Sequence, residues 1–259
     1  MVGMNLELDG RVYVLTGASR GLGFATAQCL VADGARVIVS SRDTARVDAA
    51  VGALNTQAGE ERAAGISADL SDSSTPQLLL DSALSRFGRI DGALLSVGGP
   101  PRTTAAQATD DQWREAFETL FLGSVRAART VLPCLGDGGV VGFVLSTSVR
   151  APLAGLGLSN GLRPGLAGVV KDMADEYGPR GVRVFGILPH RILTDRNREL
   201  FAATGDAAAA QAEAEASIPL RRLGDPVEFG RVAAFLLSPA ASYLTGLSVP
   251  VDGGALRAI

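Results

Sequence analysis

The octapeptide Thr16-Gly17-Ala18-Ser19-Arg20-Gly21-Leu22-Gly23 is the most informative stretch of this sequence. It overlaps the end of a short apolar run, Arg11–Thr16, and leads into a segment with helical spacing of apolar residues, Leu22–Asp33. A second run rich in β-branched residues, Arg36–Ser40, comes next. Because strands and helices have different apolar periodicities, this order predicts a strand, a tight glycine turn, a helix and a second, parallel strand.

Further short apolar runs follow, each separated from the next by a segment long enough for a helix. They are Ala63–Ala68, Ala93–Val97, Val140–Leu145, Val182–Leu188 and Leu247–Val251. This alternation predicts an α/β fold of the Rossmann type, doubly wound, in which helices cover both faces of a parallel sheet. No repeat or long linker interrupts the pattern, so we expect one domain over residues 1–259.

The composition excludes several classes of protein. Of the 259 residues, 47% are hydrophobic and 20% are charged, which argues against a disordered, collagenous or coiled-coil chain. A net charge of -3 without a basic run argues against nucleic acid as a partner. No apolar stretch is long enough to cross a bilayer, and the first residues lack a signal-peptide pattern. We therefore expect a cytoplasmic protein that has no membrane contact.

Cysteine and histidine are too few to build a disulfide framework or a metal site. Cys29 and Cys134 are far apart and the chain has one histidine, so neither is expected. The alanine-rich segment Ala202–Ala216 is either a helix by propensity alone or part of a mobile flap over the site, at about 193–217. The sequence leaves both interpretations open.

The glycine-rich octapeptide predicts a phosphate-binding turn. At the amino end of a helix, backbone N–H groups and the helix dipole can hold a pyrophosphate. The spacing here is Gly-x-x-x-Gly-x-Gly, whereas the usual dinucleotide fingerprint is Gly-x-Gly-x-x-Gly. Such a turn can serve chain geometry alone, but its place in the first βαβ unit favours dinucleotide binding. The residues expected to contact the dinucleotide are Gly17, Ser19, Arg20, Gly21, Leu22 and Gly23.

This spacing resembles that of the short-chain dehydrogenase/reductase family, and the resemblance extends over nearly the whole chain. Asp69-Leu70 looks like the family's adenine-contacting pair, and Leu95-Ser96-Val97-Gly98 stands where the family usually has Asn-Asn-Ala-Gly. Pro189 and Thr194 match the family's Pro-Gly-x-x-x-Thr loop, and Ile218–Gly254 resembles its carboxyl-terminal signature. Within the family, the chain is similar to 3-oxoacyl-ACP-reductase-like proteins.

The resemblance implies a seven-stranded parallel sheet, a nicotinamide dinucleotide cofactor and a homotetramer. Two paired long helices, here about 109–133 and 158–178, would form one interface, and the strand ending at Gly254 would form a second. The apolar residues expected at the first interface are Phe117, Phe121, Val169 and Met173. The residues expected at the cofactor beyond the glycine turn are Asp69, Leu70, Ser96, Val97, Gly98, Arg163, Pro189, Ile192 and Thr194.

The end of the second strand, Ser40-Ser41-Arg42, favours NADP(H) over NAD(H). NAD-specific sites place a carboxylate on the adenosine ribose, and that carboxylate would repel a 2′-phosphate. Here no acid is present, and Arg20 adds a second guanidinium that can fork onto a phosphate. We expect Arg20, Ser41 and Arg42 to bind the 2′-phosphate; the alternative for Arg42 is a solvated residue at a strand end.

The catalytic positions implied by the resemblance are altered. The family has a proton-donating tyrosine and, four residues later on the same helix face, a lysine. Aligning Glu176–Val184 with the family's helix end and sixth strand places this pair at Ser159 and Arg163. The family's serine falls at Ser146 or at one of the next two residues, and its asparagine falls at Leu120.

No other residue restores the lost pair. The tyrosines are Tyr13, Tyr177 and Tyr243, all outside the expected site, and the only lysine is Lys171, eight residues beyond Arg163. A serine hydroxyl has too high a pKa to replace the phenol, and an arginine stays protonated. Arg163 can still bind the ribose or the substrate; the alternative is a surface arginine.

His190 is the remaining titratable candidate, at the carboxyl end of the sixth strand, where ligands gather in doubly wound sheets. It is either the proton donor or a structural histidine. Three residues, Arg102, Arg150 and Arg191, follow strand ends and either face an anionic substrate or are merely solvated. Ser146 either contacts substrate or satisfies the local backbone. The candidate catalytic residues are Ser146, Ser159, Arg163 and His190.

Together these features predict an NADP(H)-dependent oxidoreductase with rearranged proton delivery, acting on a small carbonyl, enone or imine-type substrate. One alternative is a non-redox enzyme on the same scaffold, such as a lyase, isomerase or cyclase. Another is a catalytically silent dinucleotide-binding protein. The fold alone does not choose among them, because function resides in the site.

Overall fold

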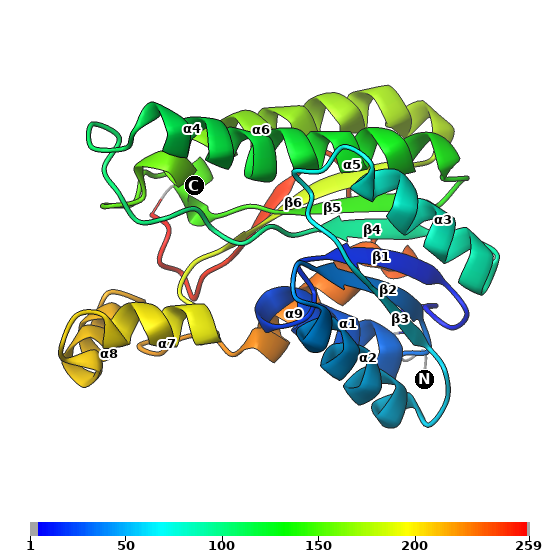
Figure 1. Ribbon diagram of the computed structural model, residues 1–259, viewed down its shortest axis with the longest axis horizontal. Helices are drawn as coiled ribbons and strands as arrows, with labels where there is room; N and C mark the ends of the chain where they lie inside the picture. Colours follow the sequence, from blue (N-terminus) through cyan, green and yellow to red (C-terminus); the bar gives the residue numbers. More distant parts are fainter. Residues whose placement is uncertain (1–4, 258–259) are drawn as a thin grey trace.

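A computed structural model describes residues 5–257 of the chain. Over these residues seven strands form one parallel sheet in the order β3-β2-β1-β4-β5-β6-β7 (Figure 1). The strands are β1 Val12–Thr16, β2 Arg36–Ser41, β3 Ala63–Ser67, β4 Gly92–Leu95, β5 Val140–Val144, β6 Arg183–Pro189 and β7 Ser248–Val251. The doubly wound Rossmann-type fold predicted from the sequence is confirmed, and the predicted strand ends differ by only one or two residues.

Helices cover both faces of this sheet (Figure 1). They are α1 Gly21–Ala32, α2 Thr44–Ala58, α3 Thr75–Phe87, α4 Asp110–Ala116, α5 Gly123–Val131, α6 Gly157–Tyr177, α7 Asp195–Ala202, α8 Ala207–Ala216 and α9 Pro226–Leu237. One hydrophobic core lies between the sheet and α3, α5 and α6, and a second lies between the sheet and α1, α2 and α9. Strands buried on both faces explain why the apolar runs are continuous and do not alternate with polar residues.

The helix expected over about 109–133 is interrupted. Between α4 and α5 the chain forms a wider π-helical turn, Phe117–Leu122, in which Leu120 is buried. Directly after it, a Cβ on Gly123 would lie 2.6 Å from the carbonyl oxygen of Leu70. The turn thus accompanies close packing of this helix on the loop after β3, a contact that helical periodicity does not reveal.

The alanine-rich segment forms a helix over only part of its length. A single helix over Ala202–Ala216 is wrong, because Gly205 has φ +86° and Asp206 caps a new helix by accepting from the N–H of Ala209 at 3.0 Å. The result is a helix pair, α7 and α8, which projects from the body of the molecule (Figure 1). The pair encloses a small core of its own, formed by Phe201, Ala214, Ile218 and Leu223.

The expected interface residues differ in exposure. Phe117 is 43% exposed and stacks on Phe121, with ring centroids 5.2 Å apart. Met173 is only 7% exposed, because α6 turns it into the core of the protomer. Little of the Met173 side chain is therefore left to contact a partner, and the interface role expected of these residues stays a prediction.

Candidate active site

The glycine-rich turn leaves the amino end of α1 open to an anion. Gly17 and Gly21 have φ of +57° and +59°, a region that favours glycine. Arg20 is the residue that precedes the helix, and no side chain caps the first turn, which also contains no acidic residue. The N–H groups at this helix end therefore have no side-chain acceptor and can bind a pyrophosphate.

Close packing ties this turn to the loop after β4. A Cβ on Gly17 would lie 2.6 Å from the carbonyl oxygen of Ser96, and a Cβ on Gly23 would lie 2.7 Å from the carbonyl oxygen of Gly17. The Thr16 hydroxyl donates to the Ser96 carbonyl and accepts from the Ser96 N–H, both at 2.9 Å. At Gly98, by contrast, a Cβ would meet open space. β1 and β4 flank the point where the strand order reverses, which is where ligands bind in such sheets.

At the end of β2, the Ser41 hydroxyl oxygen is buried and has no hydrogen-bond partner among the described residues. Next to it, the Arg42 side chain is 78% exposed and lies 3.9 Å from the Asp69 carboxylate. Arg20 pairs instead with Glu199 of α7, at 3.6 Å. Each guanidinium group is therefore close to a different carboxylate. The unpartnered Ser41 hydroxyl and the exposed Arg42 guanidinium, both at the end of β2, nevertheless suit a phosphate.

The remaining cofactor candidates line the same edge of the sheet. Thr194 precedes α7, and its methyl group lies 3.6 Å from the Cβ that Gly21 would carry. Pro189 ends β6, and Leu70 and Ile192 are buried. An open helix end, positive-φ glycines and the orphaned Ser41 hydroxyl together fit a dinucleotide with a phosphorylated ribose.

The structure brings two buried serines together at the predicted catalytic position. The hydroxyl oxygens of Ser148 and Ser159 are 3.2 Å apart, and both residues are almost fully buried. Ser146 accepts a hydrogen bond from the Ser148 N–H at 3.1 Å, which is the local backbone role weighed for it above. Of the residues to which the family's serine aligns, Ser146 to Ser148, the 3₁₀ turn Thr147–Val149 brings Ser148 to Ser159.

His190 contacts the same turn. Its Nδ1 lies 3.0 Å from the hydroxyl oxygen of Thr147, the residue before Ser148. Burial, and then the Arg191 charge, lower the pKa of His190, while Asp252 acts in the opposite direction. The imidazole is therefore mostly neutral at pH 7, which favours a hydrogen-bonding or basic role over proton donation.

Arg163 is buried, and it is not the surface residue of the alternative interpretation. Its side chain donates to the carbonyl oxygen of Val144 at 2.8 Å and has no carboxylate partner among residues 5–257. Burial, and then the Arg196 charge, lower its pKa to about 10, so the group stays a cation at neutral pH. An unpaired buried cation is costly unless an anion or a ring of acceptors joins it.

The chain's tyrosines and its lysine do not reach this site. Tyr13 is buried and donates to the carbonyl oxygen of Leu237 at 3.1 Å, and Tyr243 is fully exposed. Lys171 pairs with Asp175 at 2.8 Å on the surface. No group of three His, Cys, Asp or Glu side chains in the described part of the chain is placed to hold a metal ion. None of its helices is long and apolar enough to cross a membrane.

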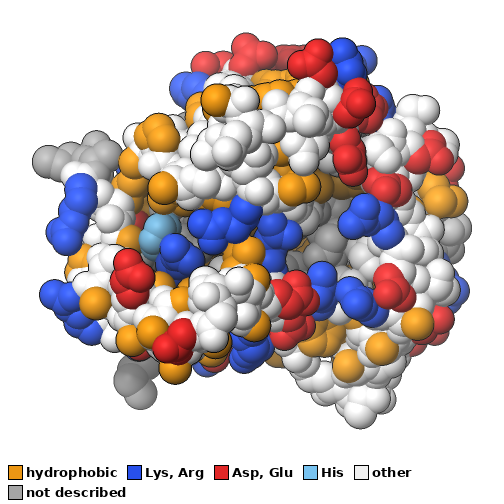
Figure 2. Space-filling view, turned by 60° about the vertical axis from the view of Figure 1, so that its left-hand side comes forward, with side chains coloured by type: hydrophobic (Ala, Val, Ile, Leu, Met, Phe, Trp, Pro, Cys, Tyr) orange, Lys and Arg blue, Asp and Glu red, His pale blue; other side chains and the backbone are white. Residues whose placement is uncertain are grey.

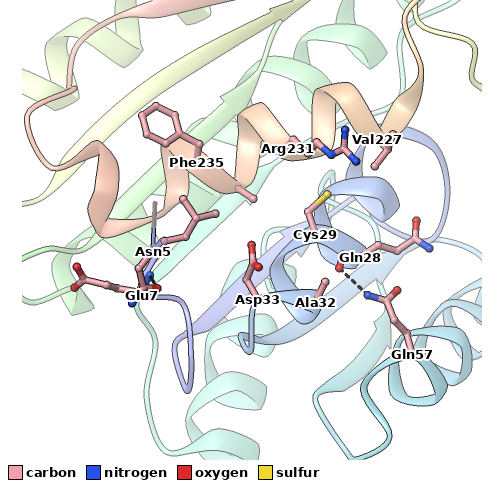
Figure 3. A pocket seen from close by; sticks show the side chains of 12 residues that line it. Asn5, Glu7, Gln28, Cys29, Ala32, Asp33, Gln57, Val227, Arg231 and Phe235 are labelled. Carbon is pink, nitrogen blue, oxygen red and sulfur yellow. Dashed lines mark hydrogen bonds between the residues drawn. The ribbon is translucent and has the colours of Figure 1, made fainter. Parts of the chain in front are cut away.

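A pocket lies between α1 and α9, away from this site (Figure 3). It is lined by Gln28, Cys29 and Asp33 near the carboxyl end of α1, whereas the glycine turn is at the amino end. Burial raises the pKa of the Cys29 thiol, so this cysteine is not an activated nucleophile. Because the pocket lies at the opposite end of α1 from the glycine turn, it is separate from the candidate active site.

Comparison with known proteins bears on the family and the fold of this chain. Residues 17–255 match the family model described as enoyl-(acyl carrier protein) reductase. An uncharacterized oxidoreductase of Mycobacterium tuberculosis is 35% identical over 96% of this chain and 93% of its own length. L-Sorbose reductase of Gluconobacter frateurii, complexed with NADPH and L-sorbose, superposes with a TM-score of 0.92 at 28% identity over 99% and 100% of the two chains. An NADPH-bound short-chain oxidoreductase of Pseudomonas aeruginosa, described as containing an atypical catalytic center, gives 0.90 at 31% identity over 96% and 98%.

Proposed function

The chain belongs to the short-chain dehydrogenase/reductase family, and from this premise we propose that it is an NADP(H)-dependent oxidoreductase with a non-standard active site. Its substrate is a small carbonyl, enone or imine-type compound. The observation that carries the proposal is the cofactor cradle, which we define as the uncapped amino end of α1, the positive-φ glycines Gly17 and Gly21, and the Ser41 hydroxyl at the end of β2. That hydroxyl is buried and has no hydrogen-bond partner among the described residues. The NADPH found in two solved relatives supports the choice of dinucleotide.

The residues around the reacting centre suit hydride transfer without a phenol. The nicotinamide supplies the hydride when the cofactor is bound, so the protein needs to align the reactants and stabilise charge. The hydroxyls of Ser148 and Ser159 can donate to a substrate oxygen, and the Arg163 cation can stabilise negative charge that develops there. His190, held by Thr147, can exchange a proton through water.

Cofactor binding and turnover separate this proposal from its alternatives. Equilibrium titration with NADPH should show tight binding, and stopped-flow absorbance should then show NADPH oxidation with some member of a carbonyl, enone and imine panel. Tight binding without oxidation of NADPH by any member would favour a non-redox enzyme or a silent dinucleotide-binding protein. Absence of binding would refute the proposal.

Arg42→Ala is expected to weaken NADPH binding about 10- to 100-fold, the effect of losing a charge-assisted contact to the 2′-phosphate. NADH affinity should hardly change, because NADH lacks that phosphate. Isothermal titration of both cofactors measures the difference. Arg46→Ala is the matched control, since Arg46 is a nearby exposed arginine that pairs with Asp43 at 3.2 Å. Equal weakening of both cofactors by Arg42→Ala would show that Arg42 does not read the 2′-phosphate.

The proposed functional unit is a homotetramer. The stacked and partly exposed Phe117 and Phe121 support an interface on the α4–α5 side of the protomer. Light scattering at micromolar concentration should give four times the protomer mass, and Phe117→Asp should lower it, because a charge would be buried in the interface. A monomeric wild-type protein would contradict this assembly.

A further inference from the structure

The helix pair α7–α8 is attached to the rest of the protein differently on its two sides. Next to β6, the Leu193 N–H donates to the Gly224 carbonyl oxygen at 2.8 Å, and the Gly224 N–H donates to the Arg191 carbonyl oxygen at 3.0 Å. The Leu220 N–H also donates to the Gly253 carbonyl oxygen, after β7, at 3.3 Å. These backbone bonds hold one side of a segment that has a small core of its own. Its other side, formed by α7, can therefore move as a unit.

Helix α7 reaches both loops that flank the predicted cofactor site. The Arg196 guanidinium donates to the Pro100 carbonyl oxygen, in the loop after β4, at 2.9 Å. The Glu199 carboxylate lies 3.6 Å from the Arg20 guanidinium, at the amino end of α1. Because the glycine turn follows β1, α7 thus spans the point where the strand order reverses. Figure 2 shows Lys and Arg side chains, with Asp and Glu side chains among them, around a hollow of the surface.

The Arg20–Glu199 pair joins α7 to a residue that is expected to bind the cofactor. Neither side chain has another polar partner among residues 5–257, and the two are 47% and 67% exposed. An ion pair between side chains this exposed is weak, because water screens the charges. The pair therefore directs Arg20 toward α7 but can be exchanged for a stronger anion.

A 2′-phosphate is such an anion. A phosphate monoester carries about −1.5 to −2 charges at pH 7, and its oxygens match the planar fork of a guanidinium. Ser41 and Arg42, at the end of β2, are expected to hold the same phosphate, so the cofactor gains contacts that Glu199 alone does not offer Arg20. When Arg20 turns to the phosphate, Glu199 loses its one cation partner in the described part of the chain.

We propose that the Arg20–Glu199 pair is a latch that the 2′-phosphate of NADP(H) opens. Arg20 exchanges the Glu199 carboxylate for the phosphate, and α7 is released from the amino end of α1. NADH lacks this phosphate and leaves the latch closed. Glu199 is then a specificity-determining residue, because it competes with the 2′-phosphate for Arg20 and lowers the affinity for NADP(H) alone. This inference rests on the proposed function, since it concerns the same cofactor site.

A double-mutant cycle on cofactor affinity tests the exchange. Glu199→Gln should tighten NADPH binding about two- to fivefold, the gain from removing a competing exposed carboxylate, and should leave NADH affinity unchanged. Arg20→Gln should weaken NADPH binding, and in that background Glu199→Gln should have no effect. Glu215→Gln is the matched control, since Glu215 lies on α8, accepts from Gln211 at 2.8 Å and carries the same charge. Isothermal titration at low, constant ionic strength measures these affinities.

Amide hydrogen exchange in α7 tests the release separately. The saturated NADPH and NADH complexes differ in the 2′-phosphate, so the amides of residues 195–202 should exchange at least twofold faster in the NADPH complex of the wild type. In Glu199→Gln the two complexes should exchange alike, because neither has a latch. Mass spectrometry of α7 peptides gives the rates, and peptides from α2 are the internal reference.

The outcomes separate the latch from the function on which it rests. Unchanged or weaker NADPH binding in Glu199→Gln would overturn the latch, as would an equal gain for NADH or a gain that persists in the Arg20→Gln background. Equal α7 exchange in the two wild-type complexes would also overturn it. These results leave the NADP(H)-dependent oxidoreductase standing. If neither the wild type nor Glu199→Gln binds NADPH, the proposed cofactor and the latch are both refuted.

Discussion

Gly17→Ala is expected to abolish useful NADP(H) binding and to destabilise the protein. A residue other than glycine in the left-handed region costs about 1–2 kcal/mol, and Gly17 has φ +57°. The new Cβ would also lie 2.6 Å from the backbone carbonyl oxygen of Ser96, which cannot rotate away because it accepts from the Thr16 hydroxyl. The turn must therefore move, and its N–H groups lose their alignment on the pyrophosphate. NADPH affinity should fall about 100-fold or more, a change of about 2.7 kcal/mol.

Two glycine variants make this result interpretable. Gly52→Ala, in the middle of α2 with nothing within 4 Å of the new Cβ, should stabilise the fold by about 0.5–1 kcal/mol and leave NADPH affinity unchanged. Gly98→Ala also meets no protein atom, so it should leave the free energy of unfolding nearly unchanged, yet it should weaken NADPH binding because its Cβ enters the cofactor cradle. Urea unfolding and isothermal titration measure the two effects. Wild-type NADPH affinity in Gly17→Ala would exclude this turn as the pyrophosphate site.

The double variant Ser159→Tyr/Arg163→Lys is expected to lower activity on the native substrate rather than raise it. If the site were a ketone reductase that had merely lost its phenol and ammonium, restoring them would supply a general acid worth about 10²–10⁴-fold in rate. The structure argues against such a gain. Ser159 is 5% exposed and in contact with Ser148, so the phenol must displace packed atoms at a cost of about 1–3 kcal/mol or enter space that the substrate uses. Lysine also lacks the planar fork by which Arg163 binds the Val144 carbonyl.

The measurement is kcat/KM of the double variant on the substrate identified by the panel, beside a set of simple ketones. Ser159→Ala serves as the control for loss of the serine hydroxyl without added bulk. A gain on the native substrate would refute the view that the site is rebuilt for a different acceptor.

His190→Ala provides a separate test of proton transfer. Loss of turnover with unchanged NADPH affinity would assign that role to the loop after β6, whereas unchanged turnover would leave His190 a structural partner of Thr147.

The sequence alone determined the fold, because its signals are local. Short apolar runs separated by helical spacing define strands and helices, and the glycine turn Thr16–Gly23 defines the first βαβ unit whatever surrounds it. The same local reasoning predicted a cofactor at the carboxyl edge of the sheet, since the carboxyl ends of parallel strands share one edge. It failed at Gly205, where one positive-φ residue divides α7 from α8, and at Phe117–Leu122, where the helix widens.

Only the tertiary structure decided which side chains meet in the site. The Ser148–Ser159 contact joins residues from a 3₁₀ turn and a helix, and the Thr147–His190 contact joins residues 43 positions apart. Whether Arg163 is a surface residue or a buried cation depends on how α6 packs against β5, and helix periodicity leaves that open. Spacing along a chain sets the direction of a side chain within its own element. Contacts between elements depend on packing and on the rotations of turns, which no local pattern encodes.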